Sequence, residues 1–130
     1  MNPPPSSRPF GRSLHVDVYG VDPKLCDDLD FGYQLLDDLV EHLQMNKQSP
    51  PFVFRSPEGE YPDKAGLSGW VPLIESGISL HTLTVKGFVS LDVYTCGCME
   101  MEPTMKFLSE RLGSTDCEVQ HLVRGLRYHD

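Results

Sequence analysis

The chain has 130 residues, of which 39% are hydrophobic and 23% are charged, as is typical of one folded domain and not of a disordered chain. Its 19 acidic and 11 basic residues give a net charge of −8, which argues against nucleic acid or an anionic membrane as the main partner. No apolar run approaches the roughly 20 residues of a membrane span, and no signal-peptide pattern follows Met1, so we expect a cytoplasmic protein.

The first half of the chain predicts a strand followed by a long helix. Residues 1–10 are rich in Pro and Ser and predict a flexible arm ahead of a single domain over residues 11–130. Apolar and polar residues alternate between Ser13 and Tyr19, which is the period of a half-buried strand. Between Leu29 and Met45 the period changes to that of an amphipathic helix, with an apolar stripe of Leu36, Leu39, Val40 and Leu43.

The second half of the chain predicts several strands and one further helix. Residues 56–66 contain Pro, Gly and charged residues and predict a surface loop. The helix is indicated by Met101, Met105, Leu108 and Leu112, with Gly113 placed as its C-terminal cap. Strands are expected over residues 52–54, 70–75, 78–83, 88–95 and 117–126. This order predicts an α+β fold: an α/β sandwich whose antiparallel-rich sheet is covered by helices on one face.

The four cysteines do not have the spacing of a metal site. Cys96 and Cys98 are separated by one residue, whereas the paired cysteines of zinc sites are separated by two or more. The expected reducing compartment also disfavours disulfides. We therefore expect no metal ion.

Reactive side chains are concentrated between residues 66 and 96. They are Ser68, Glu75, Ser76, His81 and Cys96. Taken singly they decide nothing, because Ser68 lacks the Gly-x-Ser-x-Gly spacing of a nucleophile elbow and no cysteine-protease signature surrounds Cys96. His81 is equally compatible with a core histidine.

The order and spacing of these residues are more specific. The segment begins Gly66-Leu-Ser-Gly69, continues with Glu75-Ser76 and Ile78-Ser-Leu-His-Thr82, and ends with Asp92-Val-Tyr-Thr-Cys-Gly97. With these four motifs at these separations the chain resembles the bacterial and archaeal S-adenosylmethionine decarboxylase family. A weaker likeness at Gly11–Asp17 extends the resemblance over most of the chain.

The resemblance implies a proenzyme that cuts itself between Glu75 and Ser76 into a β chain, 1–75, and an α chain, 76–130. The Ser76 hydroxyl would attack the Glu75 carbonyl, and elimination would convert Ser76 into a pyruvoyl group. That group forms a Schiff base with the amine of a small amino-acid-type substrate, so no dissociable cofactor is expected.

The resemblance also implies roles for the remaining residues. His81 and Ser68 would assist processing, and Cys96 would return a proton to the substrate carbon. Cys98, by contrast, is expected to pack in the core. The resemblance further implies a homodimer of cleaved αβ units, with the active sites near the interface.

Three departures from the family pattern leave alternatives for the function. Gly77 stands where the family usually has His after the cleavage site, and Leu83-Thr84-Val85 replaces a usual Trp-Pro-Glu segment whose glutamate is thought to hold ribose hydroxyls. The family aromatic before the Gly-x-Ser-Gly segment falls near Pro62, with Tyr61 beside it. The first hypothesis is decarboxylation of S-adenosylmethionine in polyamine synthesis. The alternatives are the same chemistry on ornithine or arginine, and a non-catalytic regulatory relative.

Overall fold

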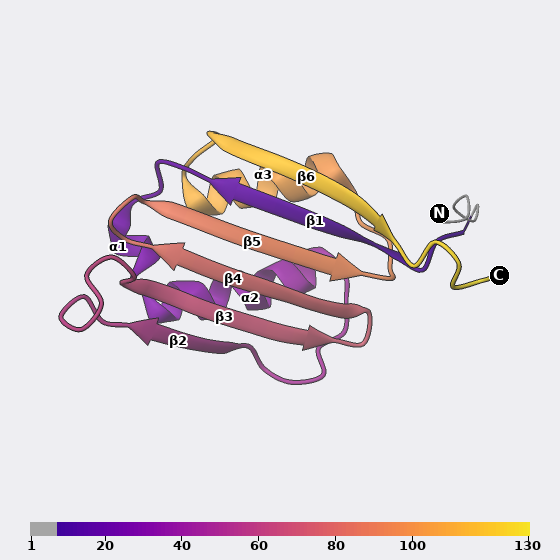
Figure 1. Cartoon of the computed structure of the whole chain (residues 1–130), viewed down its shortest axis with the longest axis horizontal. Helices are drawn as coiled ribbons and strands as arrows, with labels where there is room; N and C mark the ends of the chain where they lie inside the picture. The colour runs from indigo at the N-terminus through magenta and orange to yellow at the C-terminus, as the bar shows by residue number, and fades with distance from the viewer. Residues whose placement is uncertain (1–7) are drawn as a thin grey trace.

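A single antiparallel sheet organises residues 8–130, which are the residues that the computed structural model describes (Figure 1). The six strands lie in the order β2-β3-β4-β5-β1-β6, so the first strand of the chain is paired between the fifth and the last. Their bounds are β1 Gly11–Val18, β2 Phe52–Ser56, β3 Gly66–Leu73, β4 Ser76–Leu83, β5 Phe88–Thr95 and β6 Cys117–Arg124.

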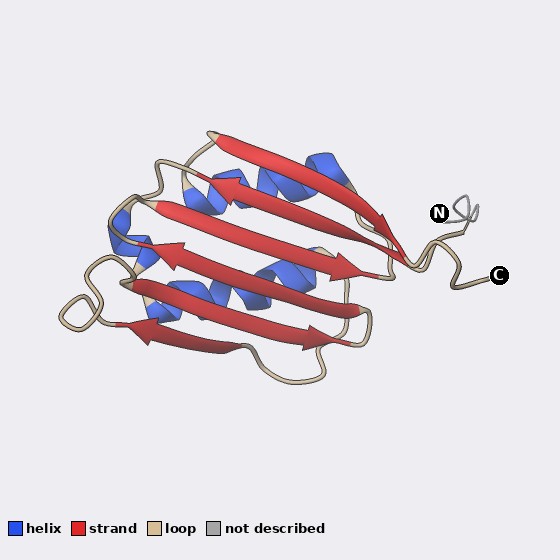
Figure 2. Ribbon diagram, in the orientation of Figure 1, coloured by secondary structure: helices blue, strands red, loops and turns tan. Residues whose placement is uncertain are grey.

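Helices cover only one face of this sheet (Figure 2). Their bounds are α1 Pro23–Cys26, α2 Leu29–His42 and α3 Met101–Leu112. The Asp28 side chain caps α2 by accepting a hydrogen bond from the Phe31 amide at 3.1 Å. As predicted, α3 ends at Gly113, whose φ of 69° is favourable for glycine. The α+β fold with helices on one face is therefore confirmed.

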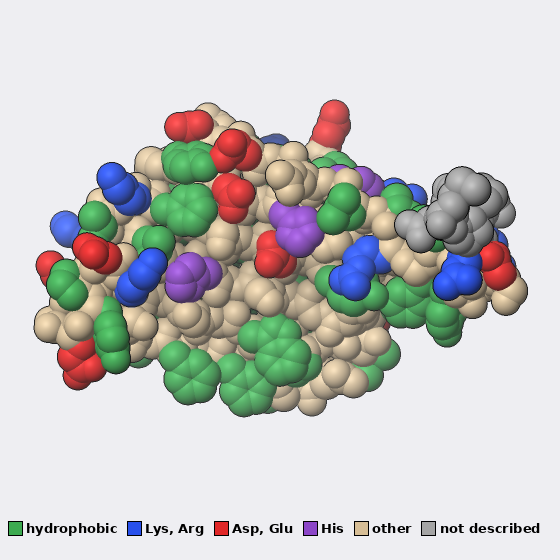
Figure 3. All heavy atoms as spheres, viewed as in Figure 1, with side chains coloured by type: hydrophobic (Ala, Val, Ile, Leu, Met, Phe, Trp, Pro, Cys, Tyr) green, Lys and Arg blue, Asp and Glu red, His purple; other side chains and the backbone are tan. Residues whose placement is uncertain are grey.

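The core lies between the sheet and its helices. Alternate residues of β1, namely Leu14, Val16 and Val18, are buried there, and Leu36 and Leu39 of α2 are fully buried against the sheet. Among residues 8–130, no helix covers the other face of the sheet. Figure 3 shows this open face, with histidine and acidic side chains over its middle strands and large hydrophobic side chains gathered along its lower edge.

The largest departures from the predicted elements occur around the third strand. The strand predicted to begin at residue 70 begins at Gly66, because residues 66–70 pair with β2. Only glycine fits at position 66, because its φ is +151° and a Cβ would lie 2.0 Å from the Thr82 carbonyl oxygen.

The short helix α1 was not predicted from the sequence. The Asp22 side chain caps it by accepting a hydrogen bond from the Lys24 amide at 2.9 Å.

The ends of the domain are held together. The Phe10 amide donates to the Gly125 carbonyl at 3.0 Å, and its ring packs edge-on against Tyr128 with a centroid distance of 4.8 Å. Residues 1–7 of the predicted arm lie outside the described residues. Within the described part, no helix is both long and apolar enough to cross a membrane.

Candidate active site

The predicted cleavage point lies in the tight turn between β3 and β4. Leu73 and Ser76 are cross-strand partners, so Ile74 and Glu75 alone form the turn. Ser76 has a φ of +140°, a conformation that side chains other than glycine rarely adopt. Such a residue carries about 1–3 kcal/mol of backbone strain. The structure thus holds strain at the residue predicted to carry the reacting hydroxyl.

Hydrogen bonds fix the acyl side of the Glu75–Ser76 bond. The Cys96 amide donates to the Glu75 carbonyl oxygen at 2.8 Å. The Glu75 carboxylate accepts from the Asn46 amide at 2.9 Å and from Asn46 Nδ2 at 2.8 Å. These Asn46 donors lower the pKa of the Glu75 carboxyl below its usual value. Sequence reasoning missed Asn46, because nothing in the sequence links it to a turn 29 residues away.

Cys96 follows the end of β5 and lies beside this turn. Ser76 pairs with Thr95 across β4 and β5, which brings the next residue, Cys96, to the turn. The Cys96 side chain is exposed, as its proposed contact with substrate requires. Cys98 is exposed as well, so the expectation that it packs in the core is wrong. The cause is that β5 ends at Thr95 and the strand alternation does not continue.

Ser68 and His81 form a second group on the open face. They are cross-strand partners in β3 and β4, and Ser68 Oγ lies 3.2 Å from His81 Nδ1, within hydrogen-bonding distance. Both residues are exposed. The alternative of a core histidine is therefore wrong, since the buried positions of β4 are those of Ile78, Leu80 and Thr82.

The two groups are far apart within one chain. His81 is five residues beyond Ser76 on the same strand, and five extended residues span about 16 Å. A side chain cannot bridge that distance. The structure therefore brings Glu75, Ser76 and Cys96 together, and separately Ser68 and His81, but it does not join the groups in one protomer.

A hollow on the open face adjoins Ser76. Its volume is about 480 Å³, and it is lined by Phe10, Trp70, Ser76, Gly77, Ser79, Asp92 and Tyr94. Asp92 Oδ1 lies 2.7 Å from His15 Nδ1, so a carboxylate–imidazole pair is part of its surroundings. The hollow combines aromatic walls with an acidic group next to the predicted reacting residue.

The Trp70 side chain fills the space next to Gly77. A Cβ at position 77 would lie 3.1 Å from the indole Nε1 of Trp70. The Trp70 side chain is 48% exposed and stacks on Phe52 with a centroid distance of 6.2 Å. The indole thus occupies space beside Gly77 that a larger residue at position 77 would need.

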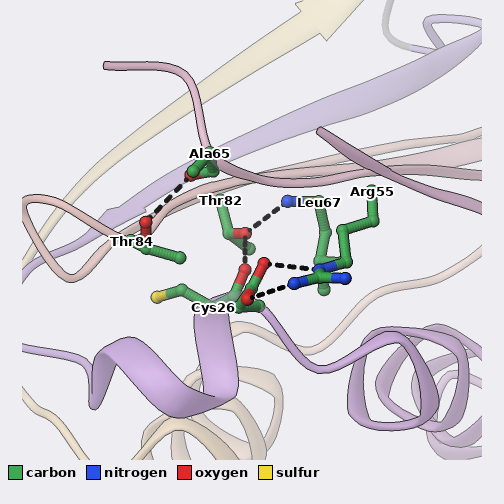
Figure 4. Close-up of polar contacts among 7 residues, drawn as sticks. Cys26, Arg55, Ala65, Leu67, Thr82 and Thr84 are labelled. Carbon is green, nitrogen blue, oxygen red and sulfur yellow. Dashed lines mark hydrogen bonds and ion pairs between the residues drawn. The ribbon is translucent and has the colours of Figure 1, made fainter. Parts of the chain in front are cut away.

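Another hollow, with a volume of about 660 Å³, has none of the predicted site residues in its lining. It lies beside Thr84 and Arg55, near the contacts drawn in Figure 4, where Thr82 Oγ1 accepts from the Leu67 amide at 2.8 Å and donates to the Cys26 carbonyl. Burial raises the pKa of the Cys26 thiol to about 11, which makes it unreactive. Of these two hollows, the one lined by Ser76 is therefore the candidate active site.

No group of His, Cys, Asp or Glu residues among residues 8–130 has the arrangement of a metal site. The reactive groups at the Ser76 turn are a hydroxyl, a carbonyl held by an amide, and a thiol. This set fits intramolecular acyl transfer followed by proton transfer.

Comparison with known proteins gives one consistent family. A family model described as S-adenosylmethionine decarboxylase matches residues 12–125. The S-adenosylmethionine decarboxylase proenzyme of Thermoplasma volcanium is 32% identical over 118 residues, which cover 88% of this chain and 85% of that one. The proenzyme of Geobacillus kaustophilus is 29% identical over 118 residues, covering 91% and 90%.

A solved structure has the same fold. It is the adenosylmethionine decarboxylase of Aquifex aeolicus, which superposes with a TM-score of 0.77 at 28% identity and covers 92% of this chain and 93% of its own. Residues 12–125, which the family model matches, include both groups of the site.

Proposed function

Because the chain belongs to the S-adenosylmethionine decarboxylase family, we propose that it cleaves itself between Glu75 and Ser76 and then decarboxylates S-adenosylmethionine, a step of polyamine biosynthesis. The observation that carries this proposal is the strained Ser76, whose preceding carbonyl accepts a hydrogen bond from the Cys96 amide at 2.8 Å. The proenzyme names of the relatives support self-cleavage.

The first step is an acyl shift within the turn. Ser76 Oγ attacks the Glu75 carbonyl carbon, the C–N bond breaks, and the hydroxyl proton passes to the released nitrogen, which leaves an ester. The Cys96 amide stabilises the negative charge that develops on the Glu75 oxygen. Relief of the strain at Ser76 favours the shift over the intact peptide.

The second step is an elimination that needs a base. Removal of the Ser76 α-proton breaks the Cβ–Oγ bond and releases Glu75 as a carboxylate. The dehydroalanine that remains takes up water and loses ammonia to give the pyruvoyl group. His81 is our candidate base, with Ser68 at 3.2 Å orienting its ring.

His81 of the same chain is about 16 Å along the strand from Ser76, so we propose that it acts on a partner chain. The open sheet face carries Ser68 and His81 and the hollow that Ser76 helps to line. The same face carries the exposed side chains of Phe52, Phe54 and Trp70. Apolar side chains of this size commonly mark a protein interface. Two copies packed through these faces would bring His81 of the partner subunit to Ser76, which supports a homodimer of cleaved αβ units.

The pyruvoyl group supplies a carbonyl that binds the substrate amine and withdraws electrons as carbon dioxide leaves. Residues of the chain itself bind the substrate and supply the proton. The aromatic walls and Asp92 of the hollow favour a positively charged substrate. Cys96, exposed beside the turn, protonates the substrate carbon.

The Cys96→Ala variant is expected to cleave but to decarboxylate poorly. Its backbone amide, which holds the Glu75 carbonyl, is kept, whereas the proton donor is lost. Loss of a general acid lowers the rate by about 10²- to 10⁴-fold. Release of labelled carbon dioxide measures the rate, and intact mass measures the cleavage. Cys98→Ala is the matched control, with the wild-type rate expected; a full rate in Cys96→Ala would show that another group is the acid.

Substrate choice is tested with the cleaved protein and three carboxyl-labelled amino acids. We expect carbon dioxide from S-adenosylmethionine and none from ornithine or arginine. One observation favours the alternatives: Val85 is 61% exposed and cannot accept hydrogen bonds from ribose hydroxyls. Turnover of ornithine or arginine alone would replace the substrate and keep the chemistry. Cleavage without turnover of any of the three would contradict the proposed substrates, and an uncut, inert chain would indicate the non-catalytic relative.

A further inference from the structure

We propose that Asn46 is a positioning residue for self-cleavage, which holds the acyl side of the Glu75–Ser76 bond in place for attack by Ser76. The proposal rests on the proposed cleavage site. It adds to that site a residue from the segment between α2 and β2, 29 positions before the turn.

Asn46 contacts the turn through three of its polar groups. Its amide donates to Glu75 Oε1 at 2.9 Å, and its side-chain Nδ2 donates to Glu75 Oε2 at 2.8 Å. Its carbonyl oxygen accepts from the Ile74 amide at 2.9 Å. Both residues of the turn are therefore bound to Asn46, and the Glu75 carboxylate is engaged through both oxygens.

These contacts complete a frame around the bond that breaks. The Glu75 carbonyl is held by the Cys96 amide at 2.8 Å, and Ser76 is held in the sheet by its pairing with Thr95. Because the residues on both sides of the Glu75–Ser76 bond are held, these contacts oppose a shift of the turn that would relieve the strained φ of Ser76. Removing the Asn46 side chain frees one oxygen of the Glu75 carboxylate, so the turn gains a way to relax and the carbonyl loses its fixed approach to Ser76 Oγ.

The Asn46 side chain is not what attaches its segment to the domain. The Gln48 amide donates to the Pro72 carbonyl at 2.9 Å, and Lys47 forms a β-bridge with Leu73. Both contacts use backbone atoms and remain when Asn46 is truncated. Lys47 is a matched control, because it is the next residue and its exposed side chain pairs with Asp37 and not with the turn.

The test follows cleavage of newly purified proenzyme by intact mass over time. We expect Asn46→Ala to cleave about tenfold to a hundredfold more slowly than the wild type, the range given by one lost hydrogen bond to a charged group. Lys47→Ala should cleave at the wild-type rate. Equal thermal unfolding midpoints of the two variants would confirm that the fold is unchanged.

Two further measurements separate positioning from a general structural effect. In a His81→Ala background the elimination is blocked, so hydroxylamine, which cuts esters, reports the acyl shift alone; Asn46→Ala should lower the amount cut. In a Glu75→Ala background Asn46→Ala should have no further effect, since its side-chain partner is absent.

A wild-type cleavage rate in Asn46→Ala would overturn the proposal. So would an equal slowing of Glu75→Ala by the second substitution, because Asn46 would then act without the Glu75 side chain. Failure of the proposed function has a different signature: the wild-type chain itself stays whole or is cut at another bond, which removes the role of Asn46 with it.

Discussion

Ser76→Ala is expected to remain one uncut chain of 14.6 kDa without decarboxylase activity. The wild type should yield two fragments, residues 1–75 and 76–130, the second beginning with a pyruvoyl group. Alanine has no oxygen to attack the Glu75 carbonyl, so the ester cannot form and no pyruvoyl group arises. The expected loss is complete, because both cleavage and decarboxylation depend on the same atom.

Intact-mass measurement after long incubation checks this result. Ser109→Ala is the control, since Ser109 is in α3 and belongs to neither group of site residues; it should cleave as the wild type does. Two fragments from Ser76→Ala would place the cleavage at another bond. Adding hydroxylamine to the wild type during processing should speed the cut, since it attacks the ester at Glu75.

Mixed dimers of Ser76→Ala and His81→Ala chains are expected to regain cleavage that neither variant has alone. In the mixed dimer, the His81→Ala chain still has Ser76, and the partner's His81 is intact. One of the two sites is therefore complete. The other site lacks both residues, so the Ser76→Ala chain should stay whole.

Differently tagged chains, expressed together and purified through both tags, give the mixed dimer, and intact mass identifies which chain is cut. Each variant expressed alone is the control and should remain without a pyruvoyl group. If the mixed dimer is not cut while the wild type is, Ser76 and His81 act within one chain. That result would contradict the partner-chain assignment drawn from the distance of about 16 Å along β4.

The fold was predictable because its signals are local. Alternation in residues 13–19 and the helical stripe between Leu29 and Met45 each depend on neighbours a few positions apart, and both elements are present. Gly113 was likewise recognisable as a helix end. Boundaries were less predictable: β3 begins at Gly66 because β2 pairs with it, and this pairing is a contact between distant segments.

The family and the five candidate residues were also predictable from the sequence, because the motifs lie in order at characteristic separations. The sequence did not indicate how those residues are grouped in space. A strand carries residues five positions apart to opposite ends of a long extended segment, so closeness in sequence between Ser76 and His81 is not closeness in space.

The surroundings of the cleavage bond, by contrast, depend on contacts between segments that are distant in the sequence. The positive φ of Ser76 follows from how the β3–β4 turn is seated, and the contacts from Asn46 and the Cys96 amide come from segments 29 and 21 residues away from Glu75. No local pattern encodes such contacts, since they exist only once the sheet has paired and the α2–β2 segment has packed beside the turn. Residue types specify the chemistry available to this protein, whereas the packing of distant segments sets the geometry in which a backbone bond becomes reactive.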